Sequence, residues 1–531
     1  MPPSYPAPEP AAKSCPSFKQ EQNLVRQILA TSSLHVMFEA AQYFNACIYT
    51  ELHCITELGP NPHVYRITPA ILHHASSLPE YLQLSTVCMA LGHYMAANLP
   101  PGEQYLHHKP RAMVERFYSY RGKAIRSLNE ALGTASVTKT HAVTNQFHDV
   151  LLIGVLTQLL VDAQHGLPLA WRCHLSGLER LISLRGGLAS ISRVPALEPL
   201  LVSVLFIAVI SETTCPSSAL ATTFLTNTHT DSATIYAYIR QCTAASPFHL
   251  CPPHLFAEIA NINDIRRRAS MTGNTDPSSF QAHVGEPRFG ASCTLERILA
   301  FDVDHWASSK AAGRSAEGAA LQRWRVVGQA FKAATGLYCV LSLPPLQGAP
   351  LETPAVDVPA FQPDDRRDVL AARLLSTLAE ATHFPCVRRF MLWPLVVLGI
   401  SAGADSETGS GRCLARDNNE GGVPRTMLGD YGDTSSISTE NGNNNISQSS
   451  SSSADHATAA VRVFVSAQLV ALSRQIGTFS PLIARDVLEA FWQKNTNTFS
   501  GGMSAWDSCF DKPYVFTSQI AVDTTGVLPA D

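Results

Sequence analysis

Closely paired cysteines are missing from this sequence. Its 13 cysteines are scattered singly and no C-x-x-C pair occurs, although structural zinc modules need closely spaced ligands. The odd, dispersed set also excludes a disulfide scaffold and favours reduced thiols in an intracellular compartment. Glycine-rich phosphate loops, dinucleotide-binding fingerprints and paired catalytic carboxylates are absent as well. We therefore expect no metal, no cofactor and no catalytic residue.

Charge is also scarce. Only 15% of the residues are charged and the net charge is −4, so the chain lacks the basic excess that draws a whole protein to nucleic acid or anionic membranes. The longest uncharged apolar stretches, residues 199–211 and 390–404, fall short of the ~18 to 20 residues needed to span a bilayer. The Pro-rich N-terminus lacks the features of a signal peptide. These properties predict a soluble intracellular protein without a membrane partner.

Alternating strand patterns and fixed-period repeats are absent, and helical periodicity takes their place. Apolar residues recur at steps of three and four along several segments. The segments with this spacing are 78–98, 111–132, 169–185 and 461–476. Residues 147–166 are apolar nearly all round, which predicts a helix inside the bundle, and 480–494 is a further predicted helix. It begins with Ser480 as the expected N-cap and Pro481 in the first turn. We predict an all-α fold, a large multi-helix domain with a disordered insertion.

The stretch LAWRCHLSGLERLISLRGGLAS, residues 169–190, ends in an RGG sequence, yet RNA-binding RGG boxes are repeated and disordered. Here the spacing predicts a helix with an apolar stripe made of Trp171, Leu175, Leu178, Leu181, Ile182 and Leu184. Its expected polar side consists of Arg172, Ser176, Glu179, Arg180 and Ser183. Arg185 suits the negative end of the helix dipole, and Gly186-Gly187 supplies a left-handed C-cap. His174 borders the stripe without a second ligand nearby, which predicts a boundary residue.

Composition divides the chain into five parts. Residues 1–20 are Pro-rich and predicted to be disordered, and residues 30–402 form the first part of the helical domain. Residues 403–456 are dominated by Ser, Gly, Asn and Asp, so they bury too little apolar surface to order themselves and form a low-complexity insertion. Residues 457–495 close the domain, and 496–531 form a C-terminal tail.

The sequence GISAG at residues 399–403 matches the G-x-S-x-G nucleophile elbow of serine hydrolases, with Ser401 as the nucleophile. That elbow needs a strand before the serine and a helix directly after it. Here the low-complexity insertion follows, and the single downstream histidine is His456 at the edge of that insertion. A Ser-His-acid arrangement is hard to build from these parts. We predict that the chain is not an enzyme and retain the hydrolase as an alternative.

Three further groups contain chemically suggestive residue types. Cys242, His249, Cys251 and His254 are zinc-ligand types, but the prolines among them suit a loop between helices equally well. The pairs His73-His74 and His107-His108 lack carboxylates at ligand spacing, which predicts exposed or boundary residues. The third group is the run Arg266 to Arg268 followed by Ser270, compatible with nuclear import or a kinase site. We favour a solvated helix end with its cations near the negative dipole.

The order of several motifs resembles a known family. The motifs are FEAAQYFNACIYTEL near residue 38, PEYLQLSTVCMALGHYMA near 79, WRCHLSGLERLISLRGG at 171–187, GQAFKAATGLYCVLSL at 328–343, RRFMLWPLVVLGISA at 388–402 and VLEAFW at 487–492. Together they resemble the fungal-specific transcription factor domain, the C-terminal regulatory region of fungal binuclear zinc-cluster transcription factors. The third motif is similar to the family's W..HL.GA..LI..RGG signature. The resemblance spans roughly residues 35–495 and explains GISAG as the end of a core helix.

The sequence departs from the family at its N-terminus. Members carry two C-x-x-C pairs in a basic segment that binds two zinc ions and contacts DNA, whereas here only Cys15 precedes Cys47 and no basic run occurs. No zinc ligand is carried over to this chain. Two explanations stay open: a gene model that starts too late, and a stand-alone regulatory domain.

The resemblance implies a nuclear transcriptional regulator or co-regulator of fungal genes, such as those of a metabolic or biosynthetic cluster. The expected partners are other transcription regulators or a DNA-binding partner, a second subunit in a homo- or heterodimer, and a small-molecule effector sensed in the helical core. Specific DNA binding by this chain alone is not expected. The alternatives are a serine hydrolase using Ser401 and a non-catalytic interaction scaffold.

Overall fold

The structure is a computed structural model. It describes residues 33–58, 66–98, 111–135, 141–166, 170–220, 232–241, 250–272, 290–312, 317–343, 363–414, 446–494 and 505–519. Within these ranges the fold is all-α, as the periodicity predicted, and no strand occurs.

The helices are distributed along the whole described chain. The N-terminal part contains α2 (Ser33–Tyr43), the π-helical turn η1 (Phe44–Ile48), α3 (Tyr49–His53), the 3-10 turn η2 (Cys54–Leu58), α4 (Pro69–Ser76), α5 (Glu80–Ala97), α6 (Arg111–Ala135) and α7 (His141–His165). The middle contains α8 (Ala170–Leu184), α9 (Leu188–Ile191), η3 (Pro195–Leu197), α10 (Glu198–Thr213), η4 (Ser217–Ala219), α12 (Ser232–Gln241), α13 (Pro253–Thr272), α15 (Ala291–Ala300) and α16 (Val303–Ala311). The C-terminal part contains α17 (Glu317–Ser342), α18 (Pro363–Ala381), α19 (Pro385–Arg388), α20 (Leu392–Leu414), α21 (Ile446–Ile476), α22 (Ser480–Lys494) and α23 (Ala505–Cys509).

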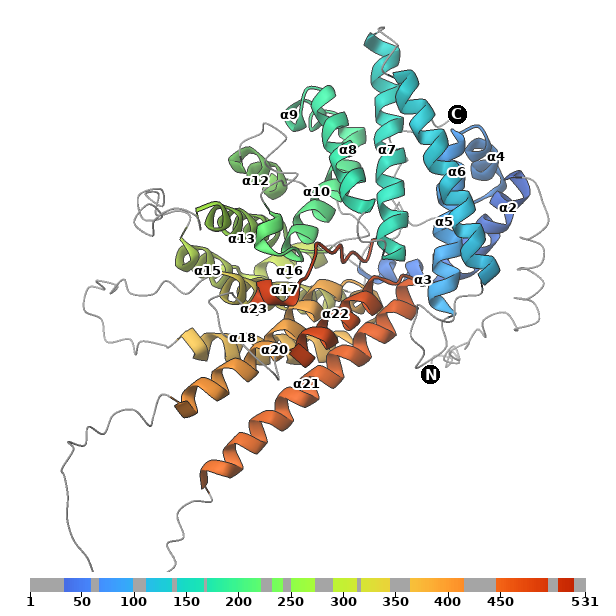
Figure 1. Ribbon diagram of the computed structural model, residues 1–531. Coiled ribbons are helices and arrows are strands. Elements are labelled where there is room, and N and C mark those ends of the chain that lie inside the picture. The colour runs from blue at the N-terminus through green and yellow to red at the C-terminus, as the bar shows by residue number, and fades with distance from the viewer. Residues whose placement is uncertain are drawn as a thin grey trace, which may run out of the picture.

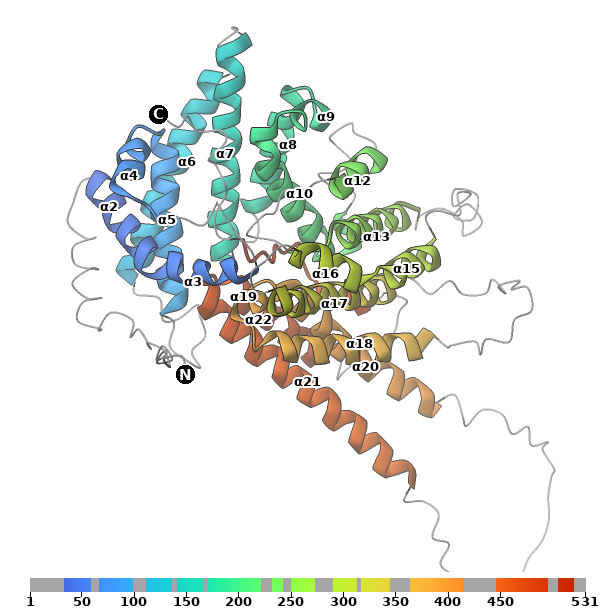
Figure 2. The same ribbon diagram turned by 180° about the vertical axis from the view of Figure 1, so that it is seen from behind.

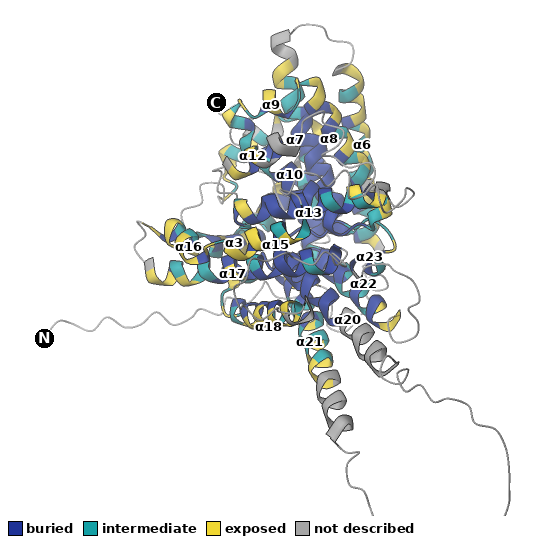
Figure 3. Ribbon diagram, turned by 90° about the vertical axis from the view of Figure 1, so that its left-hand side faces the viewer, coloured by how far each residue is buried: buried dark blue, intermediate teal, exposed yellow. Residues whose placement is uncertain are grey.

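Helix α17 lies at the centre of this arrangement. It packs against α13, α15, α16, α18, α20 and α23, so helices from both halves of the chain meet on its surface. The N-terminal helices α2, α4, α5 and α6 lie to one side and reach the C-terminal helices through contacts of α5 with α21 and of α7 with α22 (Figures 1 and 2). Buried residues concentrate where these groups meet, whereas residues 133–134 of α6 and 456–457 of α21 are exposed (Figure 3).

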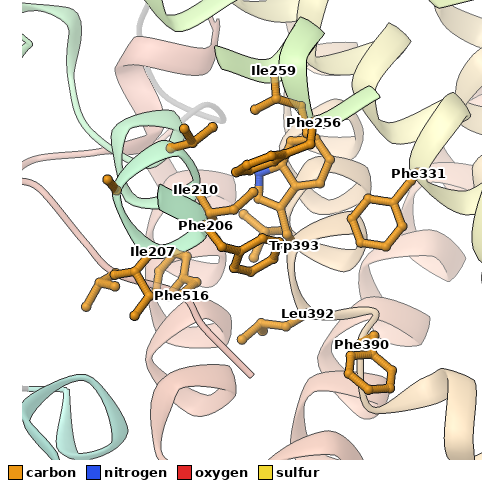
Figure 4. Packing of buried hydrophobic residues seen from close by; sticks show 14 of the residues in the cluster. Phe206, Ile207, Ile210, Phe256, Ile259, Phe331, Phe390, Leu392, Trp393 and Phe516 are labelled. Carbon is orange, nitrogen blue, oxygen red and sulfur yellow. The ribbon is translucent and has the colours of Figure 1, made fainter. Parts of the chain in front are cut away.

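The main core is lined by large aromatic side chains from distant parts of the sequence. Phe206 of α10 stacks on Phe256 of α13 with ring centroids 5.5 Å apart, and Phe331 of α17 stacks on Trp393 of α20 at 6.2 Å. Phe516, close to the C-terminus, packs among the same buried residues (Figure 4). Burying aromatic rings of this size removes much apolar surface from water, which makes this cluster a principal source of stability.

Helix α8 confirms the predicted apolar stripe with two exceptions. Trp171 is only 2% exposed, and Leu175, Leu178, Leu181 and Ile182 are also buried. Leu184, however, is 65% exposed and is the last residue of the helix. Glu179, predicted on the polar side, is buried instead, and burial raises the pKa of its carboxyl to about 7.

The predicted C-cap of α8 is confirmed. Gly186 and Gly187 have positive φ angles of 89° and 81°, which only glycine adopts without strain. The N–H of Gly187 donates to the carbonyl of Ile182 at 3.0 Å, and that of Gly186 to the carbonyl of Ser183 at 3.0 Å. These are the two hydrogen bonds of a Schellman motif, so the RGG sequence ends a core helix.

Helix α22 begins at the predicted residue but not with the predicted cap. The Ser480 hydroxyl is buried and donates to the carbonyl of Ala163 on α7 at 2.8 Å. The N–H of the preceding Phe479 donates to the carbonyl of Gln164 at 2.8 Å. The start of α22 is therefore fixed to the C-terminal end of α7 through tertiary contacts.

Among the described residues, three helices are long and apolar enough to cross a membrane by length and composition: Asn145–His165, Pro195–Thr213 and His456–Ile476. The expectation that no segment reaches spanning length is therefore wrong, because the helices continue past the uncharged runs. Their apolar windows are 72%, 78% and 22% buried inside the structure, respectively. For the first two helices, the protein interior thus explains the apolar composition.

The predicted insertion begins and ends within helices. Helix α20 continues to Leu414 and α21 starts at Ile446, so both enter the range 403–456. Figures 1 and 2 show the two helices side by side, leading away from the core. Residues 415–445, which hold much of the low-complexity sequence, lie outside the described residues.

We predict that Trp171→Ala lowers the free energy of unfolding by about 3 to 5 kcal/mol, because it removes a buried indole and leaves a cavity. Leu184→Ala is the matched control on the same helix and should change stability by no more than about 0.5 kcal/mol, since its side chain is exposed. Urea denaturation followed by circular dichroism measures both. Equal effects of the two substitutions would contradict the assignment of Trp171 to the core.

Candidate functional site

Charged and polar side chains meet in the middle of the core, where α10, α13, α17 and α23 come together. We call this group the polar centre; its members are Glu212, Asn263, Arg266, Tyr338 and Asp507. All except Asp507 are buried, and Asp507 is nearly so. Buried polar groups are costly unless they are hydrogen-bonded, so their pairing determines how these elements pack.

Arg266 is the hub of the polar centre and is 2% exposed. Its Nη1 donates to the carbonyl of Glu212 at 3.3 Å and to the Tyr338 hydroxyl at 3.0 Å. Its Nη2 donates to the carbonyl of Cys215 at 2.9 Å and to Oδ1 of Asp507 at 2.7 Å. A guanidinium stays charged inside a protein, and Asp507 supplies the opposite charge.

A second chain of bonds continues from Tyr338. Its hydroxyl donates to Oδ1 of Asn263 at 2.6 Å, and Nδ2 of Asn263 donates to the carbonyl of Val209 at 2.8 Å and to Oε2 of Glu212 at 3.4 Å. Burial raises the pKa of the Glu212 carboxyl to about 8, although the Asn263 hydrogen bond opposes this shift. Glu212 is therefore mainly protonated at neutral pH, and the net charge inside the polar centre stays small.

The C-terminal segment, residues 505–519, closes the polar centre. Trp506 is fully buried, its Nε1 donates to the carbonyl of Thr213 at 2.6 Å, and its ring lies 4.5 Å from that of Tyr338. Asp507 also accepts hydrogen bonds from the backbone N–H and hydroxyl of Ser217 at 3.0 and 2.9 Å. The predicted tail thus contains residues of the core (Figure 1).

The run Arg266 to Arg268 differs from the predicted solvated helix end. Arg266 faces the polar centre, while Arg267 and Arg268 both form ion pairs with Asp264 on the same helix. Ser270 is exposed, and its hydroxyl donates to the carbonyl of Arg267 at 2.8 Å. The prediction failed because α13 is packed on one side and continues to Thr272, so one of three consecutive residues must point inward.

His174 lies at the boundary of the core, as predicted, and contacts a buried carboxylate. Its Nε2 lies 2.9 Å from Oδ2 of Asp162, a fully buried carboxylate on α7. Asp162 also accepts two hydrogen bonds from Arg121 of α6, at 2.5 and 2.8 Å. These contacts hold the pKa of Asp162 below its usual value, against the effect of burial. The group joins α6, α7 and α8.

Ser401 does not occupy a nucleophile elbow. It is 2% exposed inside α20, with helix on both sides. The glycines of GISAG serve packing: a Cβ on Gly399 would lie 2.5 Å from Leu488, and one on Gly403 would lie 2.1 Å from Phe491, both on α22. The carbonyl of Gly399 also accepts a hydrogen bond from Trp492 Nε1 at 2.8 Å. The hydrolase alternative is not supported.

The candidate zinc ligands are not brought together in the described residues. Cys242 and His249 lie outside those residues, Cys251 is partly buried, and His254 is exposed at the start of α13. No group of three or more His, Cys, Asp or Glu side chains in the described part of the chain is arranged to hold a metal ion.

The two histidine pairs contribute no further candidate. His73 is exposed on α4, as predicted. The side chain of His74 and residues 107–108 lie outside the described part of the chain.

Comparisons with known proteins identify the family of this chain. The model of the fungal specific transcription factor domain matches residues 39–414. The phomenoic acid biosynthesis cluster-specific transcriptional regulator of Leptosphaeria maculans is 32% identical over 487 residues, which are 91% of this chain and 74% of the relative. The chain belongs to the fungal-specific transcription factor domain family. The chain itself is a transcriptional regulator. No solved structure matches it.

We predict that the stability of this regulator falls as pH rises from about 4.5 through 8, partly because of Glu212. Its pKa in the folded chain, about 8, lies above the reference value of 4.5, so the stabilising contribution is complete at low pH and is lost as the buried carboxyl ionises. Glu212→Gln should flatten this decline, and the gain over the natural chain should be larger at pH 8 than at pH 5.

The measurement is urea denaturation across that pH range. Glu296→Gln, at an exposed position on α15, is the control and should leave the pH profile of stability unchanged. A Glu212→Gln profile parallel to that of the natural chain would show that Glu212 does not titrate as a buried group.

Proposed function

We propose that this regulator acts in the nucleus, without enzymatic activity, on the genes of a biosynthetic cluster. The observation that carries the proposal is the identity of 32% across 91% of the chain with a protein named as a cluster-specific transcriptional regulator. The likeness covers the parts that build the core, including the polar centre as far as Tyr338 within the family match. The absence of a supported hydrolase site is consistent with a role in binding.

The proposal includes a protein partner that supplies sequence-specific DNA recognition. DNA affinity comes largely from cations that neutralise phosphates, and base discrimination comes from side chains carried into a groove. The densest run of arginines in the described residues is unsuited to this task, because Arg266 is buried and Arg267 and Arg268 are paired with Asp264. This supports recognition of promoters through a partner.

Deletion of the gene should lower or raise the transcripts of one group of neighbouring biosynthetic genes while most transcripts stay unchanged. RNA sequencing of the deletion strain measures this, and re-expression of the natural chain is the control that should restore the pattern. Re-expression of a Ser401→Ala chain should restore it equally well. Rescue by the natural chain but not by Ser401→Ala, with both proteins at equal abundance, would contradict a non-enzymatic role.

The purified chain should not bind duplex DNA specifically by itself. A mobility-shift titration at about 0.15 M salt, where screening already acts within ~8 Å, tests this with a cluster promoter and a scrambled duplex. We expect no shift that distinguishes the two duplexes. Tight binding that discriminates between them would show that this chain carries its own DNA-reading surface.

A further inference from the structure

The C-terminal segment, residues 505–519, is held like a bound peptide. It follows α22 after residues 495–504, which lie outside the described residues. Its helix α23 has five residues, too few to be stable without tertiary contacts, so the segment owes its conformation to the surface that it contacts. We call this surface the docking site; it comprises Thr213, Thr214, Ser217, Arg266 and Tyr338.

Two adjacent residues provide the principal contacts. The indole of Trp506 lies beside Tyr338 and donates to the carbonyl of Thr213. Asp507 pairs with Arg266 and accepts a hydrogen bond from the backbone N–H of Ser217. A buried aromatic anchor next to a charge-assisted pair is the arrangement that dominates binding energy in protein–peptide interfaces. In this chain the docking site therefore holds an aromatic residue followed by an aspartate.

The rest of the segment extends along α10. The N–H of Tyr514 donates to the carbonyl of Thr214 at 3.1 Å, and the Thr214 hydroxyl donates to the carbonyl of Tyr514 at 2.8 Å. Phe516 packs near Phe206 and Ile207 in the main core (Figure 4). Backbone pairing with alternate side-chain contacts is how extended peptides bind to folded domains.

The helices around the docking site also contact one another directly. Helix α17 packs against α13 and α20, and α10 packs against α13, without the segment between them. These contacts can keep the domain folded when the segment leaves. When residues 505–519 leave, Arg266 becomes exposed to water. Water then solvates the charge that Asp507 had balanced, which it could not do in a closed core.

We propose that the docking site is a peptide-binding site for an aromatic–aspartate motif, and that the chain's own residues 505–519 occupy it in cis and leave it by local opening of the folded domain. Partners carrying the same motif compete for the site when it opens. This inference concerns the folded chain alone, so its test does not depend on target genes or on nuclear location.

Hydrogen exchange with mass spectrometry on the full-length chain tests the opening. Asp507→Asn weakens the pair with Arg266 and should make the amides of residues 510–519 exchange about tenfold faster or more, the effect of losing a charge-assisted bond. Protection of α17 and of residues 392–403 should stay as in the natural chain. Asp511→Asn is the matched control, because Asp511 is exposed in the same segment and accepts a hydrogen bond from the nearby Tyr514 hydroxyl.

Faster exchange throughout α10, α13 and α17 in Asp507→Asn would show that the segment opens only with global unfolding and would overturn the proposal. Unchanged exchange at residues 510–519 would overturn it as well. If Asp507→Asn does not fold, a protease site placed between residues 495 and 504 of the full-length chain gives a second test that keeps every contact intact.

After cleavage at that site, a dye-labelled peptide of residues 503–521 should replace the natural segment, as measured by anisotropy, while helical circular dichroism stays constant. The affinity of a peptide with Trp506→Ala should be lower by about tenfold or by a larger factor, since the indole anchor is lost. Failure of the natural peptide to enter the folded, cleaved chain would contradict an exchangeable peptide site. Equal binding of both peptides would contradict recognition through Trp506.

Discussion

The closed form of the core depends on the pairing of Arg266 with Asp507. A guanidinium cannot lose its proton inside a protein, and moving it out of water without a partner costs several kcal/mol. The carbonyls at the end of α10 and the Tyr338 hydroxyl satisfy several of its donors, but only a carboxylate balances its charge. That carboxylate comes from residue 507, so the centre of the domain is complete only when the last described segment is in place.

Helix faces followed from the sequence because they depend on local spacing alone. Except at Leu184, the apolar stripe of α8 and its glycine cap match the expected positions, since steps of three and four define a face whatever the partner is. The same helical spacing also indicated that Arg266 is buried. Leu255, Ile259 and Ile262 continue at helical spacing to Arg266, so the periodicity places this arginine on the buried face. Its charge led to the opposite prediction, because the compensating aspartate lies 241 positions away.

The GISAG motif was misleading because a short sequence match does not determine the secondary structure around it. Five residues can match a nucleophile elbow or a helix whose glycines at positions i and i+4 allow another helix to approach closely. In α20 the second description holds, because Leu488 and Phe491 fill the space that side chains at Gly399 and Gly403 would occupy. The choice depends on whether a strand or a helix precedes the serine, and a short apolar run does not distinguish the two.

The boundary of the family match and the boundary of the physical domain are different. The match ends at residue 414, yet α20 needs α22 to cover its glycine face, and Arg266 needs Asp507. A fragment cut at residue 414 would lack the carboxylate that pairs with Arg266 and would expose the apolar side of α20. Sequence likeness within the family therefore identifies the regulatory domain, whereas the charge balance of its interior extends that domain to the C-terminal segment.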